Sequence, residues 1–289
     1  MSSQNRPASL GGVGLRYKHY QDILEQRPSK IGWLEIHPEN YFGGGPSLYY
    51  LTKIREHYPL SFHGVGLSLG SDQEPDREHL QSLKDLIKRF EPFQFSDHVS
   101  WSVSGNAHLN DLLPLPYTRE TLDRLCRNIE ITQEFLGQEI LVENPSTYLQ
   151  FKEDVMAEPD LLNALVKRTG CHLLLDINNV FVQSHNRHFN PYEYVDRVNL
   201  EFVREIHLAG HTERVIRKRG REKEVLLVDT HNRHVCQKVW DLYAYTVKKR
   251  DPVLTLIEWD QDFPTFRDLC EESYKAQDIM EQAGRKNVA

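Results

Sequence analysis

The chain has 289 residues, of which 39% are hydrophobic and 27% are charged. This balance is typical of a globular protein and excludes a disordered chain, which would hold too few apolar residues to form a core. The formal net charge is −7. An excess of negative charge argues against non-specific binding of nucleic acid, which needs clustered positive charge.

Neither membrane insertion nor secretion is indicated. No apolar run approaches the roughly 18 residues that a membrane-spanning helix requires. The first ten residues, MSSQNRPASL, lack the charged and apolar regions of a signal peptide. The four cysteines are far apart and form neither a CxxC pair nor a disulfide pattern. We therefore expect a reduced, cytoplasmic protein without membrane contact.

Short apolar segments alternate with segments of helical periodicity. The expected strands are rich in β-branched and aromatic residues, and HLLLDI and VLTLIEW are apolar on both faces. In chain order the strands are Gly12–Arg16, Trp33–His37, Leu60–Gly64, Phe93–His98, Ile140–Glu143, His172–Ile177, Val203–Leu208 and Val253–Glu258. The helices that follow them are Tyr17–Gln26, Pro46–His57, Asp76–Phe90, Thr118–Leu136, Asp160–Arg168, Pro191–Val198, Arg233–Lys248 and Phe263–Gln282.

This alternation predicts an α/β protein that folds as a single (β/α)8 TIM barrel over residues 1–289. A doubly wound sheet is the alternative fold. No linker, internal repeat or low-complexity tract divides the chain. We expect the two ends, residues 1–10 and 283–289, to be flexible.

Histidine and carboxylate side chains lie at the ends of the predicted strands. In a barrel these strand ends meet at one mouth, where the active site forms. Imidazole and carboxylate together suit iron, zinc or manganese, and there are too many of them for one tetrahedral ion. The sequence therefore predicts two or three metal ions, with carboxylates such as Glu143 as bridging ligands. The candidates are Glu35, His37, His63, Asp97, His98, Glu143, Asp176, His207, Asp229, His231 and Glu258.

Other histidines and one basic segment have ordinary structural interpretations. His172 begins its strand, at the end of the barrel opposite the mouth, so we expect a structural role. Solvated side chains are expected for His19, His57, His79 and His108. Residues 212–224 are rich in lysine and arginine. They form either a solvated hairpin or a lid or docking surface for an acidic peptide or partner.

The motifs resemble those of the multinuclear non-heme iron-dependent oxidative enzymes, in the bacterial branch that includes the bufferin maturases. The similar motifs, found from about Gly11 to Trp259, are GVGLR, LEIHPENYFGGG, HGVGLSLGS, SDHVSW, LNDLLPLPYT, VENPSTYL, LLLDINNV, EIHLAGH, DTH and LIEWD. The resemblance implies a xylose-isomerase-like barrel with two or three iron ions at its mouth. It also implies an enzyme that uses dioxygen to modify cysteine residues of a ribosomally made precursor peptide, presented by a separate partner protein.

The metal-site layout of this family is similar to that of endonuclease IV. This similarity implies which residues of this chain are metal ligands. The implied ligands are His63, His98, Glu143, Asp176, Asn179, His207, Asp229, His231 and Glu258. The nuclease has histidine where this chain has Asn179, which weakens the nuclease interpretation and leaves His185 as a substitute ligand. Glu35, Asn40 and Asp97 are candidates for orienting the ligands or the substrate.

Three other functions remain open from the sequence. A trinuclear zinc phosphodiesterase resembling endonuclease IV would use a metal-bound hydroxide, but a DNA-binding groove should be basic. A sugar isomerase or epimerase would need a divalent ion such as manganese and a catalytic base, and no lysine lies at a strand end to serve as one. A metal-storage protein would not require ligands from so many different strands.

Overall fold

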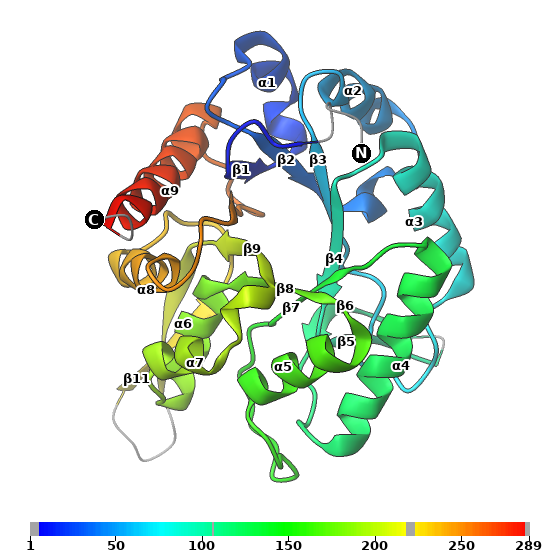
Figure 1. The fold of residues 1–289 in the computed structure, drawn as a ribbon, viewed down its shortest axis with the longest axis vertical. Helices are drawn as coiled ribbons and strands as arrows, with labels where there is room; N and C mark the ends of the chain where they lie inside the picture. Colours follow the sequence, from blue (N-terminus) through cyan, green and yellow to red (C-terminus); the bar gives the residue numbers. More distant parts are fainter. Residues whose placement is uncertain (1–5, 106, 218–222, 287–289) are drawn as a thin grey trace.

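The computed structural model describes residues 6–105, 107–217 and 223–286. Eight parallel strands close a barrel in the order β1-β12-β9-β8-β7-β4-β3-β2, and helices surround it (Figure 1). The predicted (β/α)8 barrel is therefore confirmed. The barrel strands are β1 (Gly11–Gly14), β2 (Trp33–Ile36), β3 (Leu60–His63), β4 (Gln94–His98), β7 (Leu141–Glu143), β8 (His172–Asp176), β9 (Val203–Leu208) and β12 (Leu254–Ile257).

The surrounding helices begin and end at residues that the sequence marks clearly. The side chain of Asp76 accepts a hydrogen bond from His79 N at the start of α3, and Thr118 does the same for Thr121 N at the start of α4. Gly137 ends α4 in the left-handed region. The helices are α1 (Tyr20–Gln26), α2 (Pro46–Arg55), α3 (Arg77–Phe90), α4 (Arg119–Leu136), α5 (Glu158–Thr169), α6 (Ile177–Arg187), α7 (Pro191–Arg197), α8 (Gln237–Val247) and α9 (Phe266–Lys286).

The register of the strands brings the polar strand ends to the same level. His98 lies opposite Glu143 in the β4–β7 pair. Asp176 lies opposite His207 in the β8–β9 pair. The apolar residues that precede these ends are buried on both faces of the strands, as a parallel sheet covered by helices requires. Packing of the barrel thereby fixes where the polar residues meet.

Two elements near the mouth differ from the sequence expectation. Helix α6 was not predicted, because the run INNVFVQSHN holds β-branched and amide residues that favour other structures. Asp176 starts it by accepting a hydrogen bond from Asn179 N at 2.6 Å. No strand was predicted between His98 and Ile140, yet β5 (Trp101–Ser104) and β6 (Ala107–Leu113) form an antiparallel hairpin beside the barrel.

Residues near both ends of the described chain contact the barrel, and one histidine differs from expectation. Helix α9 continues to Lys286, and Ala283 is buried. Near the other end, Leu10 O accepts hydrogen bonds from Thr255 N and Trp33 Nε1. Residues 1–5 and 287–289 lie outside the described ranges. The expectation that His19 is solvated is wrong, because its side chain is buried against α9.

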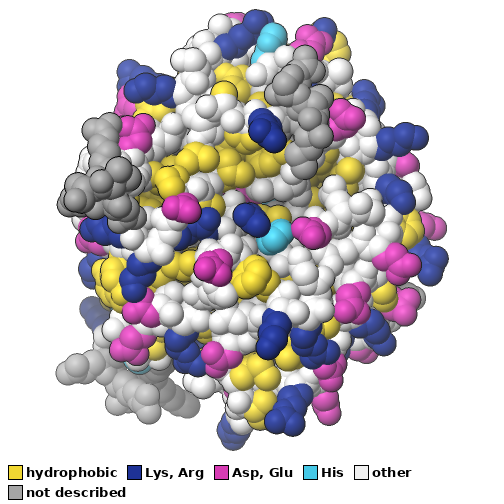
Figure 2. All heavy atoms as spheres, viewed as in Figure 1, with side chains coloured by type: hydrophobic (Ala, Val, Ile, Leu, Met, Phe, Trp, Pro, Cys, Tyr) yellow, Lys and Arg dark blue, Asp and Glu magenta, His cyan; other side chains and the backbone are white. Residues whose placement is uncertain are grey.

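The basic segment folds as a second antiparallel hairpin, formed by β10 (His211–Arg217) and β11 (Lys223–Asp229). Lys218, Arg219 and Arg221 lie outside the described residues. Figure 2 shows positive and negative side chains interspersed over the face it draws, with hydrophobic groups between them. Within the described ranges no helix is both long enough and apolar enough to cross a membrane.

Candidate metal centre

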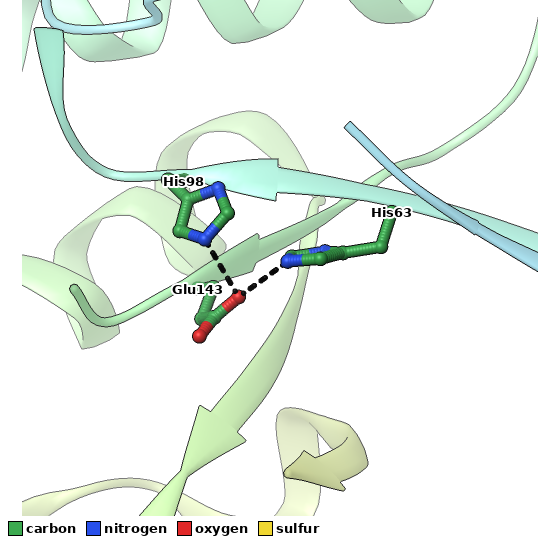
Figure 3. A group of neighbouring side chains, drawn as sticks. All are labelled: His63, His98 and Glu143. Atoms are coloured by element: carbon green, nitrogen blue, oxygen red, sulfur yellow. Dashed lines mark ion pairs between the residues drawn. The ribbon is translucent and has the colours of Figure 1, made fainter. Parts of the chain in front are cut away.

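Three side chains from neighbouring strands converge at the barrel mouth. His63, His98 and Glu143 end β3, β4 and β7. The Nε2 atoms of the two histidines lie 3.0 and 3.2 Å from the same carboxylate oxygen, Glu143 Oε2 (Figure 3). All three residues are buried, and this oxygen accepts no hydrogen bond within the described structure. The group thus points two imidazole nitrogens and one carboxylate oxygen at a common point.

Hydrogen bonds on the far side of each ring fix this arrangement. His63 Nδ1 lies 2.8 Å from Ser96 Oγ, and His98 Nδ1 donates to Gly64 O at 3.2 Å. With Nδ1 engaged, Nε2 of each ring is left for a ligand. Asp97, a predicted orienting residue, accepts hydrogen bonds from His98 N and Leu67 N, and its Oδ1 lies 4.0 Å from His98 Nδ1. It therefore connects the end of β4 to the loop after β3.

A second group lies deeper, around His207 at the end of β9. His207 Nδ1 is 3.2 Å from Glu258 Oε2, and its Nε2 is 3.3 Å from Glu35 Oε1 and 3.4 Å from Glu205 Oε1. All four residues are buried. Glu205 was not predicted. It points the same way as His207 because it lies two residues earlier on β9, and strand periodicity could have identified it.

A third group extends this cluster towards solvent. His231 Nε2 is 2.7 Å from Asp229 Oδ1, and its Nδ1 lies 2.9 Å from Asp260 Oδ2 and 3.3 Å from Glu258 Oε2. Asp260 also forms an ion pair with Arg16. Neither Asp260 nor Arg16 was predicted, although Asp260 lies two residues after Glu258 in the same motif. Glu258 therefore joins the second and third groups.

The start of α6 supplies the remaining predicted residues. Asn179 donates from Nδ2 to Asn144 O at 3.1 Å and to Glu143 Oε1 at 3.4 Å. Its Oδ1 and Asp176 Oδ2 are buried without a hydrogen-bond partner in the described structure. His185, the proposed substitute for Asn179, is exposed on α6, where its Nε2 donates to Val225 O. It is not part of the cluster.

The cluster fits bound cations. Buried polar atoms without a hydrogen bond are costly and uncommon in proteins. Several nevertheless gather here, namely Glu143 Oε2, Asp176 Oδ2, Asn179 Oδ1, Glu205 Oε1, His207 Nε2 and His231 Nε2. Ligand-type atoms of His63, His98 and Glu143, and separately those of Glu143, Asp176 and His207, lie within 4.8 Å of one another. Positive ions would complete the coordination of these atoms and offset the cost of burying them.

The pKa values of the buried groups also favour bound cations. Burial raises the pKa of Asp176 well above its ordinary value, and the negative charge of Glu143 raises it further. Burial lowers the pKa of His98 to about 4, which keeps its ring neutral as a metal ligand requires. Burial also disfavours a charged His63, but the nearby carboxylate of Glu143 outweighs it and raises the His63 pKa to about 10. Without cations, protons partly balance the buried carboxylates.

A cavity of about 420 Å³ gives access to the centre. Leu112 and Leu113 of β6 form one wall, and Tyr148 and Leu149 of the loop after β7 form another. Tyr148 OH accepts a hydrogen bond from Asp229 N. Asn40 lies apart from this cavity, exposed on the lining of a neighbouring one. The predicted strand-end residues therefore meet, while Asn40 stays at the rim.

The fold and this site define a barrel enzyme whose mouth gathers histidine and carboxylate side chains suited to metal ions. Residues 10–281 match the family described as RiPP precursor modification enzyme MbnB/TglH/ChrH, in which RiPP denotes a ribosomally made and later modified peptide. The chain belongs to this family of peptide-modifying enzymes. Its substrate class is accordingly a precursor peptide.

Relatives with similar sequences have less specific names. A UPF0276 protein of Psychromonas ingrahamii is 46% identical over 274 residues, which cover 94% of each chain. A UPF0276 protein of Caulobacter vibrioides is 46% identical over 266 residues, 92% of each chain. These names identify no reaction.

Solved structures with similar folds are more distant in sequence. Endonuclease IV from Thermus thermophilus has a TM-score of 0.55 and 17% identity, over 95% of this chain and 99% of that one. A D-allulose 3-epimerase from Methylomonas sp. has a TM-score of 0.56 and 10% identity, over 97% of each chain. These similarities confirm the xylose-isomerase-like barrel.

Proposed function

We propose that this protein is a multinuclear iron-dependent oxidase that uses dioxygen to modify cysteine residues of its precursor peptide. Family membership supports the peptide substrate. The observation that carries the metal-dependent part is the buried cluster of histidine and carboxylate atoms without hydrogen-bond partners. Imidazole and carboxylate with open positions are typical ligands of non-heme iron, and zinc and manganese accept the same ligands.

We propose the ligands from the convergent atoms. They are His63, His98, Glu143, Asp176, Asn179, His207, Asp229, His231 and Glu258, with Asn179 contributing its amide oxygen. Two or three ions fit this set. Glu143 groups both with His63 and His98 and with Asp176 and His207, and Glu258 contacts both His207 and His231. Iron at this place would bind the cysteine thiolate and transfer electrons to dioxygen. Other residues around the centre would orient these ligands.

Those residues hold the ligands and limit access of water. Asp260 accepts from His231 Nδ1 and is itself held by Arg16, so the His231 ring has one orientation. The apolar walls formed by Leu112, Leu113 and Leu149 cover the centre and lower the dielectric around a bound thiolate. Glu35 places a carboxylate against His207 Nε2, which supports its proposed orienting role.

A separate protein that presents the peptide is part of this proposal. The β10–β11 hairpin is a suitable contact, because Val215 and Val225 are cross-strand partners and both are exposed. We place the reaction in the cytoplasm, where the free cysteines Cys126, Cys171, Cys236 and Cys270 remain reduced. Shortening this hairpin should weaken peptide binding and leave metal content intact. Unchanged binding would remove the hairpin from the account.

The test is a dioxygen-dependent reaction of the iron-loaded enzyme. The enzyme is loaded with iron without oxygen and mixed with cysteine-containing precursor peptides encoded near its gene, with and without dioxygen. Mass spectrometry should detect loss of hydrogen from the cysteine-containing segment only when iron and dioxygen are both present. Zinc-loaded enzyme is the matched control. Cleavage of abasic DNA by the zinc form, with no peptide product from the iron form, would instead support a hydrolase.

A further inference from the structure

A second cavity, of about 950 Å³, adjoins the metal centre between the loop after β3 and the β5–β6 hairpin. Val65, Asp111 and Leu112 line both this cavity and the one above the centre, so the two are adjacent and share a wall. A third cavity, of about 540 Å³, shares His37 and Asp260 with the central one. The three cavities therefore follow one another across the barrel mouth, with the metal centre in the middle.

The larger outer cavity, which we call the acid-lined cavity, is strongly negative. Four of its lining residues carry carboxylates, namely Glu74, Asp76, Glu78 and Asp111, and none of the described lining residues is a lysine or arginine. Arg124 and Arg127 of α4 are nearby, but they donate to backbone carbonyls of residues 70 and 72 and do not line the cavity. The cavity thus attracts a positively charged group.

The walls of the acid-lined cavity also offer apolar contact. Val65 and Leu109 line it with 36% and 39% of their surface exposed, and Val103 and Leu112 complete this part of the lining. Lysine and arginine bury their aliphatic stems against apolar surface while the charged head remains near water or an anion. The apolar walls of the cavity suit the aliphatic stem of such a side chain, and the carboxylates suit its charged head.

The wall between the acid-lined cavity and the metal centre is held in place. Val65 N donates to Glu39 Oε1 at 3.0 Å, and Ser68 Oγ accepts from Ser102 N at 2.8 Å. Gly66 permits the close approach of His79, because a Cβ at this position would lie 2.5 Å from His79 Cε1. A wall fixed in this way needs little ordering when a ligand binds, which favours affinity.

We propose that the acid-lined cavity binds a lysine or arginine of the precursor peptide that lies a few residues from the cysteine placed at the metal centre. The peptide crosses the mouth in an extended form, and the carboxylates select it by charge. This inference rests on the proposed function, because it concerns the same peptide at the same mouth. The inference adds a requirement on the peptide sequence, a lysine or arginine near the cysteine, that the metal chemistry alone does not impose.

The experiment measures peptide binding rather than turnover. Short fluorescent peptides carry one cysteine, with a lysine placed at successive positions on either side of it, and matched peptides carry glutamate instead. Fluorescence anisotropy is recorded with iron-loaded protein in the absence of oxygen. We expect lysine at the favoured offset to tighten binding about tenfold relative to glutamate, as several partly exposed ion pairs together would.

A charge-neutralised variant separates the cavity from the general negative charge of the protein. Glu74→Gln, Glu78→Gln and Asp111→Asn combined should remove most of the lysine preference. The matched control combines Glu25→Gln, Glu134→Gln and Glu153→Gln, three exposed acids outside all three cavities, and should retain it. Equal binding of both peptide types by the unmodified protein, or a preference that survives in the cavity variant, would overturn the inference.

The outcomes distinguish this inference from the proposed function. Oxidised cysteine without any preference for lysine would reject the acid-lined cavity as a binding site and keep the oxidase. A lysine preference that depends on the cavity, with no oxidation of any cysteine peptide by the iron-loaded enzyme, would support the cavity and reject the oxidase.

Discussion

Asp176 and Asn179 are joined by a hydrogen bond of 2.6 Å from the backbone N–H of Asn179 to Asp176 Oδ1. One carboxylate oxygen therefore starts helix α6, and the other, Oδ2, is buried at the proposed metal centre without a hydrogen-bond partner among the described residues. The same hydrogen bond fixes where the Asn179 side chain lies. Helix formation and the placement of a proposed metal ligand are thus coupled at one residue.

This coupling predicts that Asp176→Asn and Asp176→Ala differ in stability but not in metal binding. Asparagine keeps the helix-capping acceptor, whereas alanine loses it at a cost of about 1 kcal/mol. In metal-free protein, Asp176→Asn should be at least as stable as the unmodified protein, because it removes the cost of burying an ionisable carboxyl group beside the negative charge of Glu143. Both variants should lose metal affinity. Thermal melts with and without metal measure this, and a destabilised metal-free Asp176→Asn would argue against a buried, repelled carboxylate.

His98→Ala should abolish turnover while the fold persists. The ring would contribute one nitrogen to the proposed centre, and its removal leaves the strands and helices of the barrel in place, so circular dichroism should be unchanged. We expect the metal content to fall and product formation to decrease at least about 100-fold, as loss of a ligand exceeds the 10–100-fold effect of losing a supporting residue. His172→Ala is the matched control, since His172 lies at the other end of the barrel and pairs with Glu139. Full activity in His98→Ala would remove His98 from the ligand set.

Removal of metal should lower the melting temperature. A cation that binds only the folded chain stabilises it by about 4 kcal/mol at a concentration of 1,000 times the dissociation constant. For a chain of this size, this corresponds to roughly 7 °C. Differential scanning calorimetry before and after chelation measures it. Identical melts would show that the buried carboxylates and histidines need no cation.

His19 gives a pH-dependent prediction remote from the metal centre. Burial lowers the pKa of His19, partly offset by its hydrogen bond to Pro264 O. A lowered folded-state pKa stabilises the protein above the unfolded value near 6.5, and this contribution is lost as the pH falls towards the folded value. The melting temperature should therefore fall more between pH 8 and pH 5 for the unmodified protein than for His19→Gln. Parallel curves for the two proteins would contradict the assignment.

The sequence predicted the barrel and most of its mouth for a physical reason. Parallel strands have a buried apolar body and one polar end. Polar residues such as His63 and Glu143 are therefore recognisable in the sequence at the ends of apolar segments. Glu205 did not stand out, because a carboxylate in the middle of a strand is expected only where a partner such as His207 compensates its burial. Helix α6 was missed since its start depends on a tertiary arrangement, in which Asp176 ends a strand and caps the next helix.

The most direct test of the account is the metal content of the protein purified without oxygen. Elemental analysis after expression in iron-supplemented medium should find two or three irons per chain, and the Glu143→Ala variant should retain fewer. Stoichiometric zinc without iron under the same conditions would contradict the iron-dependent oxidase. It would direct attention to hydrolysis at the same ligands.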